Sequence, residues 1–171
     1  MSRIVAFAPL VALMLAVILF AGWSLWGNPH VTPMALVGKP VPNVALSTLQ
    51  GGAPVALPSV AKGPVLINFY ASWCAPCAQE APALLALKAE GVRIIGVAYK
   101  DDPAAAAGFL TRLGNPYEAV LTDRDGRAGI EFGVTGVPET YAVDAKGVIR
   151  GKRAAPIDAG DAEALLKAAG G

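Results

Sequence analysis

Two cysteines separated by two residues are the part of this sequence best suited to chemistry. They lie in the sequence WCAPC at positions 73–77, and the 171-residue chain contains only these two cysteines. If a helix begins here, one turn brings the sulfur of Cys77 within disulfide reach of Cys74. A thiolate at a helix N-terminus meets unpaired backbone donors and the positive end of the helix dipole, which lowers its pKa. The spacing therefore predicts disulfide exchange, with Cys74 as the exposed attacking thiolate and Cys77 as the more buried resolving thiol.

Other uses of a cysteine pair fit this sequence less well. A structural zinc site needs about four ligands, and the chain has two cysteines and one histidine, His30, far from them in sequence. Covalent haem attachment needs a histidine directly after the second cysteine, where this chain has Ala78. A structural disulfide usually joins distant segments, because closing so short a loop removes little chain entropy. We therefore expect no metal and no cofactor other than a redox-active disulfide between Cys74 and Cys77.

Apolar runs on either side of the pair predict the elements that position it. Residues 65–71 are apolar throughout except for Asn68, as in a buried central strand, and residues 74–88 fit a helix with Pro76 in its first turn. An N-terminal β-hairpin is expected at 44–46 and 55–57. The remaining expectations are strands at 92–98, 141–144 and 148–153, a strand or extended loop at 117–121, and helices at 102–114, 128–132 and 161–169. This order predicts an α/β domain with a mixed central sheet covered on both faces.

The N-terminal segment has a different composition. Residues 4–26 carry no charged side chain, and as a helix they would be about 34 Å long, against a hydrocarbon core of about 30 Å. Arg3 precedes this segment, and Trp23 and Trp26 lie where an aromatic belt is expected. The pattern predicts one transmembrane helix with a cytoplasmic tip (1–26) and an exported remainder. A cleaved signal peptide is the alternative, but its apolar core is usually shorter and ends in a small-x-small site.

A proline-rich linker is expected between this anchor and the folded domain. Residues 27–43 contain four prolines, at positions 29, 33, 40 and 42, and predict a semi-rigid spacer in which His30 is solvated. The folded domain is then expected at 44–171. The formal net charge of +1 argues against a nucleic-acid partner, which would need a broad basic surface.

Beyond the cysteine pair, several motifs resemble a known family. The WCAPC motif after a strand resembles the thioredoxin superfamily, in which a second loop places a cis-proline against the active-site disulfide. The sequences YKDDP (99–103), LGNPY (113–117) and GVTGVPET (133–140) resemble the cytochrome c maturation thioredoxins, the CcmG/DsbE family of thiol:disulfide interchange proteins. The resemblance covers nearly the whole chain, and its most specific part is residues 133–140.

The resemblance implies roles for further residues. Pro138 matches the cis-proline, and Val137 would present its backbone to an extended substrate peptide. Glu80 and Glu139 match acidic residues that the family keeps near its active site, where a carboxylate could handle the proton of the resolving thiol. For Glu80 the alternative is a solvated helix residue. Trp73 would shield the disulfide and offer a hydrophobic docking face, with core packing as its alternative.

The family further implies where such a protein works and with which partners. It would be a single-pass protein of the bacterial inner membrane with its catalytic domain in the periplasm. It would take electrons from a membrane thiol–disulfide transporter and keep the haem-binding cysteines of apocytochrome c reduced, directly or through a maturation thiol protein. A general periplasmic dithiol oxidase or isomerase is the alternative, because it would use the same fold and motif. Thiol peroxidase and copper delivery fit less well, since residue 71 is alanine and His30 is distant.

Overall fold

The computed structural model describes residues 3–26 and 35–170 of the chain. Contacts divide the chain into two units, Met1–Thr32 and Pro33–Gly171. The first unit contains helix α1 (Arg3–Trp26), with Pro9 inside it. Among the residues whose side chains are described, no helix is long and apolar enough to cross a membrane. The side chains of Trp23 and Trp26 and the first part of the expected linker (27–34, with His30) lie outside the described residues.

The second unit is built on a seven-stranded mixed sheet in the order β2-β1-β5-β4-β3-β6-β7. Strands β3, β4 and β5 run parallel, and β6 pairs antiparallel with β3. Strand β7 continues the sheet as the antiparallel partner of β6. The strands are β1 (Ala45–Thr48), β2 (Val55–Ala56), β3 (Val65–Tyr70), β4 (Ile94–Tyr99), β5 (Ala119–Asp123), β6 (Glu139–Val143) and β7 (Ile149–Arg153). The expected mixed sheet and the expected N-terminal hairpin are confirmed.

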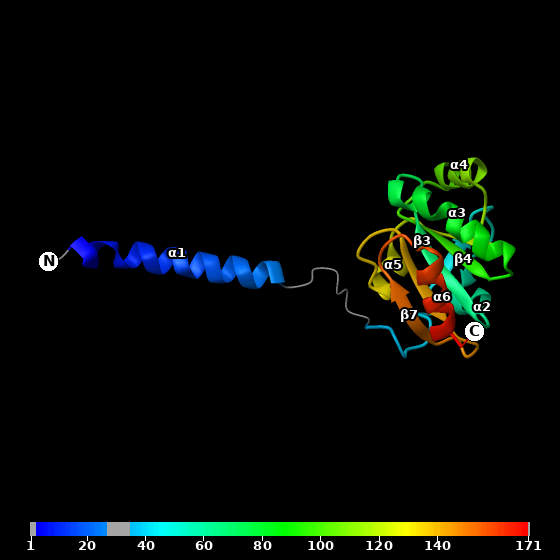
Figure 1. Cartoon of the computed structure of the whole chain (residues 1–171). Coiled ribbons are helices and arrows are strands. Elements are labelled where there is room, and N and C mark those ends of the chain that lie inside the picture. The colour runs from blue at the N-terminus through cyan, green and yellow to red at the C-terminus, as the bar shows by residue number, and fades with distance from the viewer. Residues whose placement is uncertain (1–2, 27–34, 171) are drawn as a thin grey trace. The chain divides into compact units, whose positions relative to one another are not determined.

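Helices cover both faces of this sheet (Figure 1). On one face, α3 (Ala75–Ala89), α4 (Pro103–Leu113) and α6 (Ala159–Ala168) contribute Leu84, Phe109 and Leu165 to a cluster with β3 and β4. On the other face, α2 (Leu57–Val60) and α5 (Arg127–Phe132) contribute Leu57 and Phe132 to a second cluster. The order β3-β4-β5 places α3 and α4 on one face, as right-handed crossovers require. Alternate residues of β3 therefore contact different helices.

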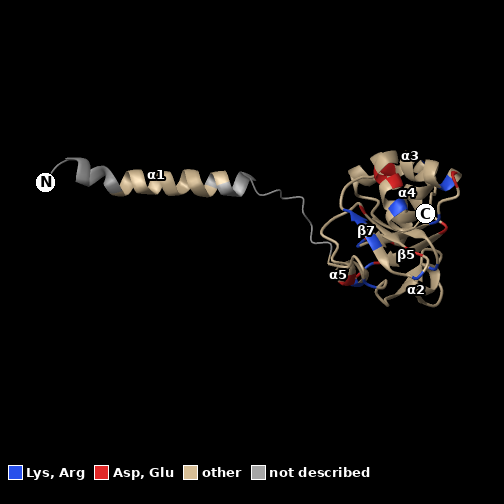
Figure 2. Ribbon diagram, turned by 60° about the horizontal axis from the view of Figure 1, so that its bottom comes forward, with Lys and Arg blue, Asp and Glu red and all other residues tan. Residues whose placement is uncertain are grey.

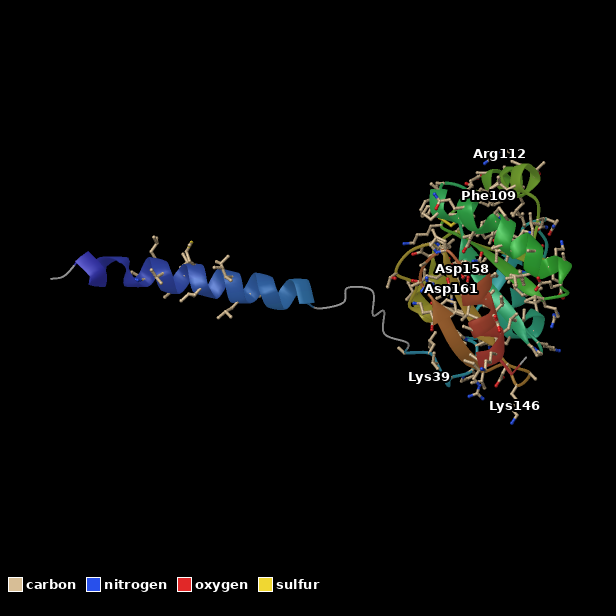
Figure 3. The ribbon with its side chains drawn as sticks, in the orientation of Figure 1. Lys39, Phe109, Arg112, Lys146, Asp158 and Asp161 are labelled. Carbon is tan, nitrogen blue, oxygen red and sulfur yellow. A yellow bond between two sulfur atoms is a disulfide. The ribbon has the colours of Figure 1, made fainter. Side chains whose placement is uncertain are left out.

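Short polar side chains set where the helices begin. Asp102 caps α4 by accepting hydrogen bonds from the backbone N–H of Ala104 and Ala105. Asp158 and Asp161 form a capping box at the start of α6 (Figure 3). Helix α3 differs, because its N-cap residue is Cys74. Charged residues are spread over this unit, and β7 carries a run of basic side chains (Figure 2).

Part of the expected linker packs against the folded unit. The backbone N–H of Gly38 donates to Ile149 O at 2.8 Å, and that of Val41 donates to Gly147 O at 2.9 Å. Val41 is buried, and Pro40 bridges to Val148. The ordered packing therefore begins before residue 44, because the apolar side chains between the prolines cover the edge of the core beside β7.

Several local elements differ from the sequence-based expectation, and β6 begins at Glu139, two residues before the expected strand at 141–144. The single turn of α2 was not expected, because four residues are too few to show a helical period. Residues 117–121 were expected as a strand or a loop, and the strand β5 begins two residues later, at Ala119. The short helix α2 is an additional element, the other differences shift boundaries, and none changes the order of the layers.

Candidate active site

The two cysteines form a disulfide at the start of α3. Their Cα atoms are 5.3 Å apart, and the Cys74 sulfur accepts a hydrogen bond from the backbone N–H of Cys77 at 3.1 Å. Strand β3 ends at Tyr70, so the pair lies directly beyond the carboxyl end of a central strand. Cys74 is 4 % exposed and Cys77 is 2 % exposed. The expectation of an exposed Cys74 is therefore wrong for the oxidised form, since both residues are covered by the surrounding loops.

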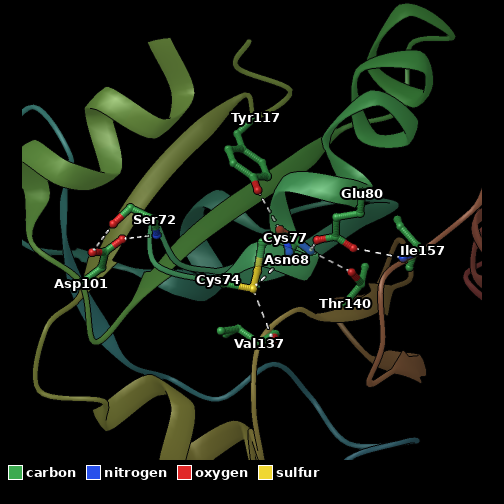
Figure 4. The surroundings of a disulfide bond; sticks show 10 residues. All are labelled: Asn68, Ser72, Cys74, Cys77, Glu80, Asp101, Tyr117, Val137, Thr140 and Ile157. Atoms are coloured by element: carbon green, nitrogen blue, oxygen red, sulfur yellow. Dashed lines mark hydrogen bonds between the residues drawn. A yellow bond between two sulfur atoms is a disulfide. The ribbon is translucent and has the colours of Figure 1, made fainter. Parts of the chain in front are cut away.

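The loop between α5 and β6 covers the disulfide from one side. The peptide bond between Val137 and Pro138 is cis, as the family resemblance implies. The carbonyl oxygen of Val137 lies 3.4 Å from the Cys74 sulfur, and Figure 4 shows it facing that sulfur. A substrate chain that reaches Cys74 would therefore pass beside this backbone.

A buried polar network lies beneath the disulfide, centred on Asn68 of β3 (Figure 4). Its side-chain amide donates to Glu80 Oε1 at 2.9 Å and to Thr140 Oγ1 at 3.0 Å. Its carbonyl oxygen accepts a hydrogen bond from the Tyr117 hydroxyl at 2.7 Å. Burial raises the pKa of the Tyr117 hydroxyl, and the neighbouring Tyr70 and Glu80 raise it further. The amide of Asn68 thus connects β3, α3, β6 and the segment before β5.

Glu80 is the acidic residue of this network. It is 2 % exposed, so the alternative of a solvated helix residue is wrong. Its second oxygen accepts a hydrogen bond from the backbone N–H of Ile157 at 3.0 Å. Burial raises the pKa of the Glu80 carboxyl to about 7, although the hydrogen bonds from Asn68 and Ile157 act in the opposite direction. Glu80 lies three residues after Cys77, on the same side of α3, which places a carboxyl that titrates near neutral pH beside the resolving thiol.

Glu139 is buried too, but its carboxylate is bound elsewhere. In β6, Glu139 and Thr140 point to opposite faces of the sheet, and Thr140 faces the network of Asn68. Glu139 instead forms an ion pair with Lys152 of β7, at 2.8 Å. One of its oxygens accepts hydrogen bonds from the backbone and hydroxyl of Thr135. The structure therefore brings Glu80, and not Glu139, beneath the disulfide.

Trp73 lies on the surface beside the cysteine pair. It is 61 % exposed, so core packing is excluded as its main role, and its indole N–H donates to Lys100 O at 3.3 Å. The neighbouring Asp101 was missed as a site residue. Its carboxylate accepts hydrogen bonds from the backbone and hydroxyl of Ser72 at 2.6 and 2.8 Å, and from the backbone N–H of Asp102 at 2.9 Å. Only its place in the YKDDP sequence could have drawn attention to it.

The chemistry of this arrangement is thiol–disulfide exchange. A sulfur at a helix N-terminus, a buried second sulfur and a buried carboxyl are the parts that attack, resolution and proton transfer need. In the described part of the chain, no group of three or more His, Cys, Asp or Glu side chains could hold a metal ion. The buried carboxylate of Asp123, at the end of β5, accepts hydrogen bonds from the backbone of Ala128 and Gly129.

Sequence comparison places the chain among proteins with this chemistry. Residues 36–166 match the Redoxin family model. The chain is 42 % identical over 160 residues to the thiol:disulfide interchange protein DsbE of Pseudomonas aeruginosa, covering 92 % of this chain and 88 % of that protein. It is 41 % identical over 160 residues to the thiol:disulfide interchange protein HelX of Rhodobacter capsulatus, covering 92 % and 90 % of the two chains.

Solved structures share the architecture. A thio-disulfide isomerase from Thermus thermophilus superposes with a TM-score of 0.64 and 28 % identity, covering 77 % of this chain and 96 % of that one. A thioredoxin-family thiol:disulfide interchange protein from Chlorobium tepidum gives a TM-score of 0.63 and 26 % identity, with 77 % and 96 % coverage. With its paired cysteines at the start of α3 and its thioredoxin-like sheet, the chain belongs to the redoxin family, among the thiol:disulfide interchange proteins of the DsbE/HelX type.

Proposed function

We propose that this protein is a membrane-anchored reductant of protein disulfides in cytochrome c biogenesis. In the reduced protein, the Cys74 thiolate attacks one sulfur of a client disulfide, and the other client sulfur leaves as a thiolate. The Cys77 thiolate then attacks the Cys74 sulfur, which releases the second client thiolate and forms the Cys74–Cys77 disulfide. Two electrons pass to the client, whose two thiolates take up protons.

The observation that carries this proposal is the position of the Cys74 sulfur between the α3 N-terminus and the Val137 carbonyl, 3.4 Å away. The helix N-terminus stabilises a thiolate on Cys74 in both the attacking and the leaving step. The backbone beside the cis-proline offers an edge to which an extended client chain can add as a short strand. The exposed indole of Trp73, the residue before Cys74, would supply an apolar contact for the client.

Glu80 is the proposed acceptor of the resolving thiol's proton. Cys77 must lose its proton before it attacks, and it is almost fully buried. A carboxyl with a pKa of about 7 is well matched to proton transfer near neutral pH. Glu139 is bound in its ion pair with Lys152, so we assign the proton transfer to Glu80.

The cellular setting rests on the sequence and on the relatives. The uncharged segment 4–26 supports an anchor in the bacterial inner membrane, with the folded domain in the periplasm. The DsbE and HelX relatives support apocytochrome c, or a thiol protein that matures it, as the client. A membrane thiol–disulfide transporter is the proposed electron donor, and a tether would keep the domain near it.

The reduction potential of the Cys74–Cys77 pair tests the direction of electron flow. We expect equilibration against glutathione and thioredoxin to give a potential near or below about −200 mV. A potential near about −120 mV, where strong oxidants lie, would refute the reductase assignment and favour a general dithiol oxidase. An isomerase would instead rearrange mispaired disulfides in a scrambled substrate with no net reduction.

The anchor and the location are tested with a C-terminal alkaline phosphatase fusion, which is active only after export. We expect phosphatase activity in the membrane fraction. Active phosphatase in the soluble periplasmic fraction would instead show a cleaved signal peptide. An inactive fusion would show that the domain is not exported.

A further inference from the structure

We propose that Lys152 of β7 is a positioning residue for the substrate-binding loop of the proposed reductase. Its ammonium group lies 2.8 Å from Glu139 Oε2 and donates to Gly133 O at 3.1 Å. Gly133 and Glu139 are the two ends of the segment that carries Val137 and the cis-Pro138. One side chain from a neighbouring strand therefore ties together both ends of this loop, and the inference rests on the proposed function.

The ion pair is connected to the middle of the loop as well. The other oxygen of Glu139 accepts hydrogen bonds from the Thr135 backbone N–H at 3.0 Å and the Thr135 hydroxyl at 2.7 Å. The Tyr141 hydroxyl lies 2.9 Å from both Glu139 Oε2 and Phe132 O, and its single proton serves one of them at a time. Residues at the start, middle and end of the loop thus all interact with the Lys152–Glu139 ion pair or belong to it.

The Lys152–Glu139 ion pair is buried, which makes its loss costly for the loop. The side chain of Lys152 is 6 % exposed and that of Glu139 is 1 % exposed, so water does not readily replace either partner. The aromatic ring of Tyr141 lies below the ammonium group, at 5.3 Å from its centroid. Removal of the Lys152 charge would leave a buried carboxylate without its cation, which strongly favours rearrangement of the surrounding backbone.

Packing holds part of this loop, because Val134 and Val137 contact the core, but its two glycines make no such contacts. Gly133 has a positive φ of 62°, a conformation that glycine adopts with little cost. A side chain at Gly133 or Gly136 would meet nothing within 4 Å, so neither position is packed against neighbours. The polar contacts to Lys152 and Glu139 therefore add to the packing of Val134 and Val137 in fixing where the Val137 carbonyl lies relative to Cys74.

This arrangement predicts which substrates depend on Lys152. A peptide disulfide needs the loop backbone for strand addition as well as the Cys74 sulfur. A small organic disulfide needs only the sulfur. Lys152 and its partner lie on the opposite face of the sheet from Asn68 and Glu80, so the buried network and the N-terminus of α3 should keep their places when the loop moves.

The test compares two disulfides in single-turnover reduction by the reduced full-length protein. One is a short extended peptide with a single disulfide, and the other is hydroxyethyl disulfide. For Lys152→Met we expect the half-saturating peptide concentration to rise about tenfold, a loss of about 1.4 kcal/mol of binding. The limiting rate should stay within about twofold of wild type, because strand addition binds the peptide and takes no part in the exchange of sulfurs. The rate with hydroxyethyl disulfide should stay within about twofold of wild type, because this substrate needs only the sulfur at the helix N-terminus.

Lys146→Met is the matched control, because Lys146 is exposed in the turn between β6 and β7 and points away from the domain (Figure 3). It should leave both reactions unchanged. If Lys152→Met does not fold, Thr135→Val removes one donor to Glu139 and keeps the ion pair, and the same selective loss is expected. Equal losses with both disulfides, or no loss with either, overturn the role of Lys152. A wild-type protein that reduces neither disulfide contradicts the proposed function itself.

Discussion

Replacement of Glu80 by glutamine should change how the stability of this protein depends on pH. Burial raises the pKa of the Glu80 carboxyl from 4.5 to about 7 in the folded state. Between these values the folded protein holds a proton that the unfolded chain has lost. The free energy of unfolding therefore decreases as pH rises through this window, and the full cost is present above about pH 7.

The size of this effect follows from the difference between the two pKa values. At about 1.36 kcal/mol per pH unit, a rise from 4.5 to about 7 costs the folded state about 3 kcal/mol at alkaline pH. Glutamine does not titrate, so it removes this cost. It also introduces a loss, because both Glu80 oxygens accept from donors, the Asn68 amide and the Ile157 backbone. An amide can accept at only one of its two positions, which costs about 1–3 kcal/mol.

Urea unfolding of oxidised wild type and oxidised Glu80→Gln, from about pH 5 to about pH 8, measures the difference in their free energies of unfolding. We expect Glu80→Gln to be less stable than wild type at the acidic end. Its relative stability should then improve by about 2–3 kcal/mol toward alkaline pH. Glu163→Gln, at an exposed position of α6, is the control, because it removes a carboxylate that is not buried. A difference between wild type and Glu80→Gln that is constant with pH would refute the reasoning.

Four further predictions concern the disulfide, its supporting loop, the packing beneath it and an open position of helix α4. Cys77→Ser should accumulate a mixed disulfide between Cys74 and a client peptide, detectable by intact mass, because no second thiol remains to release the client. Asp101→Ala should lower the free energy of unfolding by about 1–3 kcal/mol, since it leaves three donors of the adjacent loops without an acceptor. Gly96→Ala should cost about 1–3 kcal/mol, because a Cβ there would lie 2.6 Å from the Tyr117 ring. At Gly108 of α4 a Cβ would meet only the flexible Arg112 side chain, at 4.0 Å, so Gly108→Ala should stabilise by up to about 1 kcal/mol. Urea unfolding measures all three stability changes.

The sequence was sufficient for features that depend on neighbouring residues. The placement of Cys74 and Cys77 at a helix start, the apolar strand before them and the hairpin of β6 and β7 are local patterns, and the structure confirms them. The same holds for the order of elements that produces a mixed sheet. Chain order and apolar periodicity restrict such elements to few arrangements.

The tertiary structure decided what the acidic residues do. In the sequence, Glu80 and Glu139 were both candidates, and spacing does not show which of them lies beneath the disulfide. Register decided the outcome, because Asn68 pairs with Thr140 and Phe69 pairs with Glu139, so the two carboxylates belong to opposite faces of the sheet.

The partners of buried polar groups were likewise invisible in the sequence. Lys152 and Glu139 are thirteen positions apart, and Asp101 and Ser72 are 29 apart. Such pairs form only when strands and loops have taken their places, and their identity then depends on side-chain direction and burial. The sequence by itself determined the reactive cysteines and the fold that presents them. Only the packed structure determined which carboxyl lies beneath the disulfide and which cation holds the loop beside it, because both depend on contacts between segments distant in the chain.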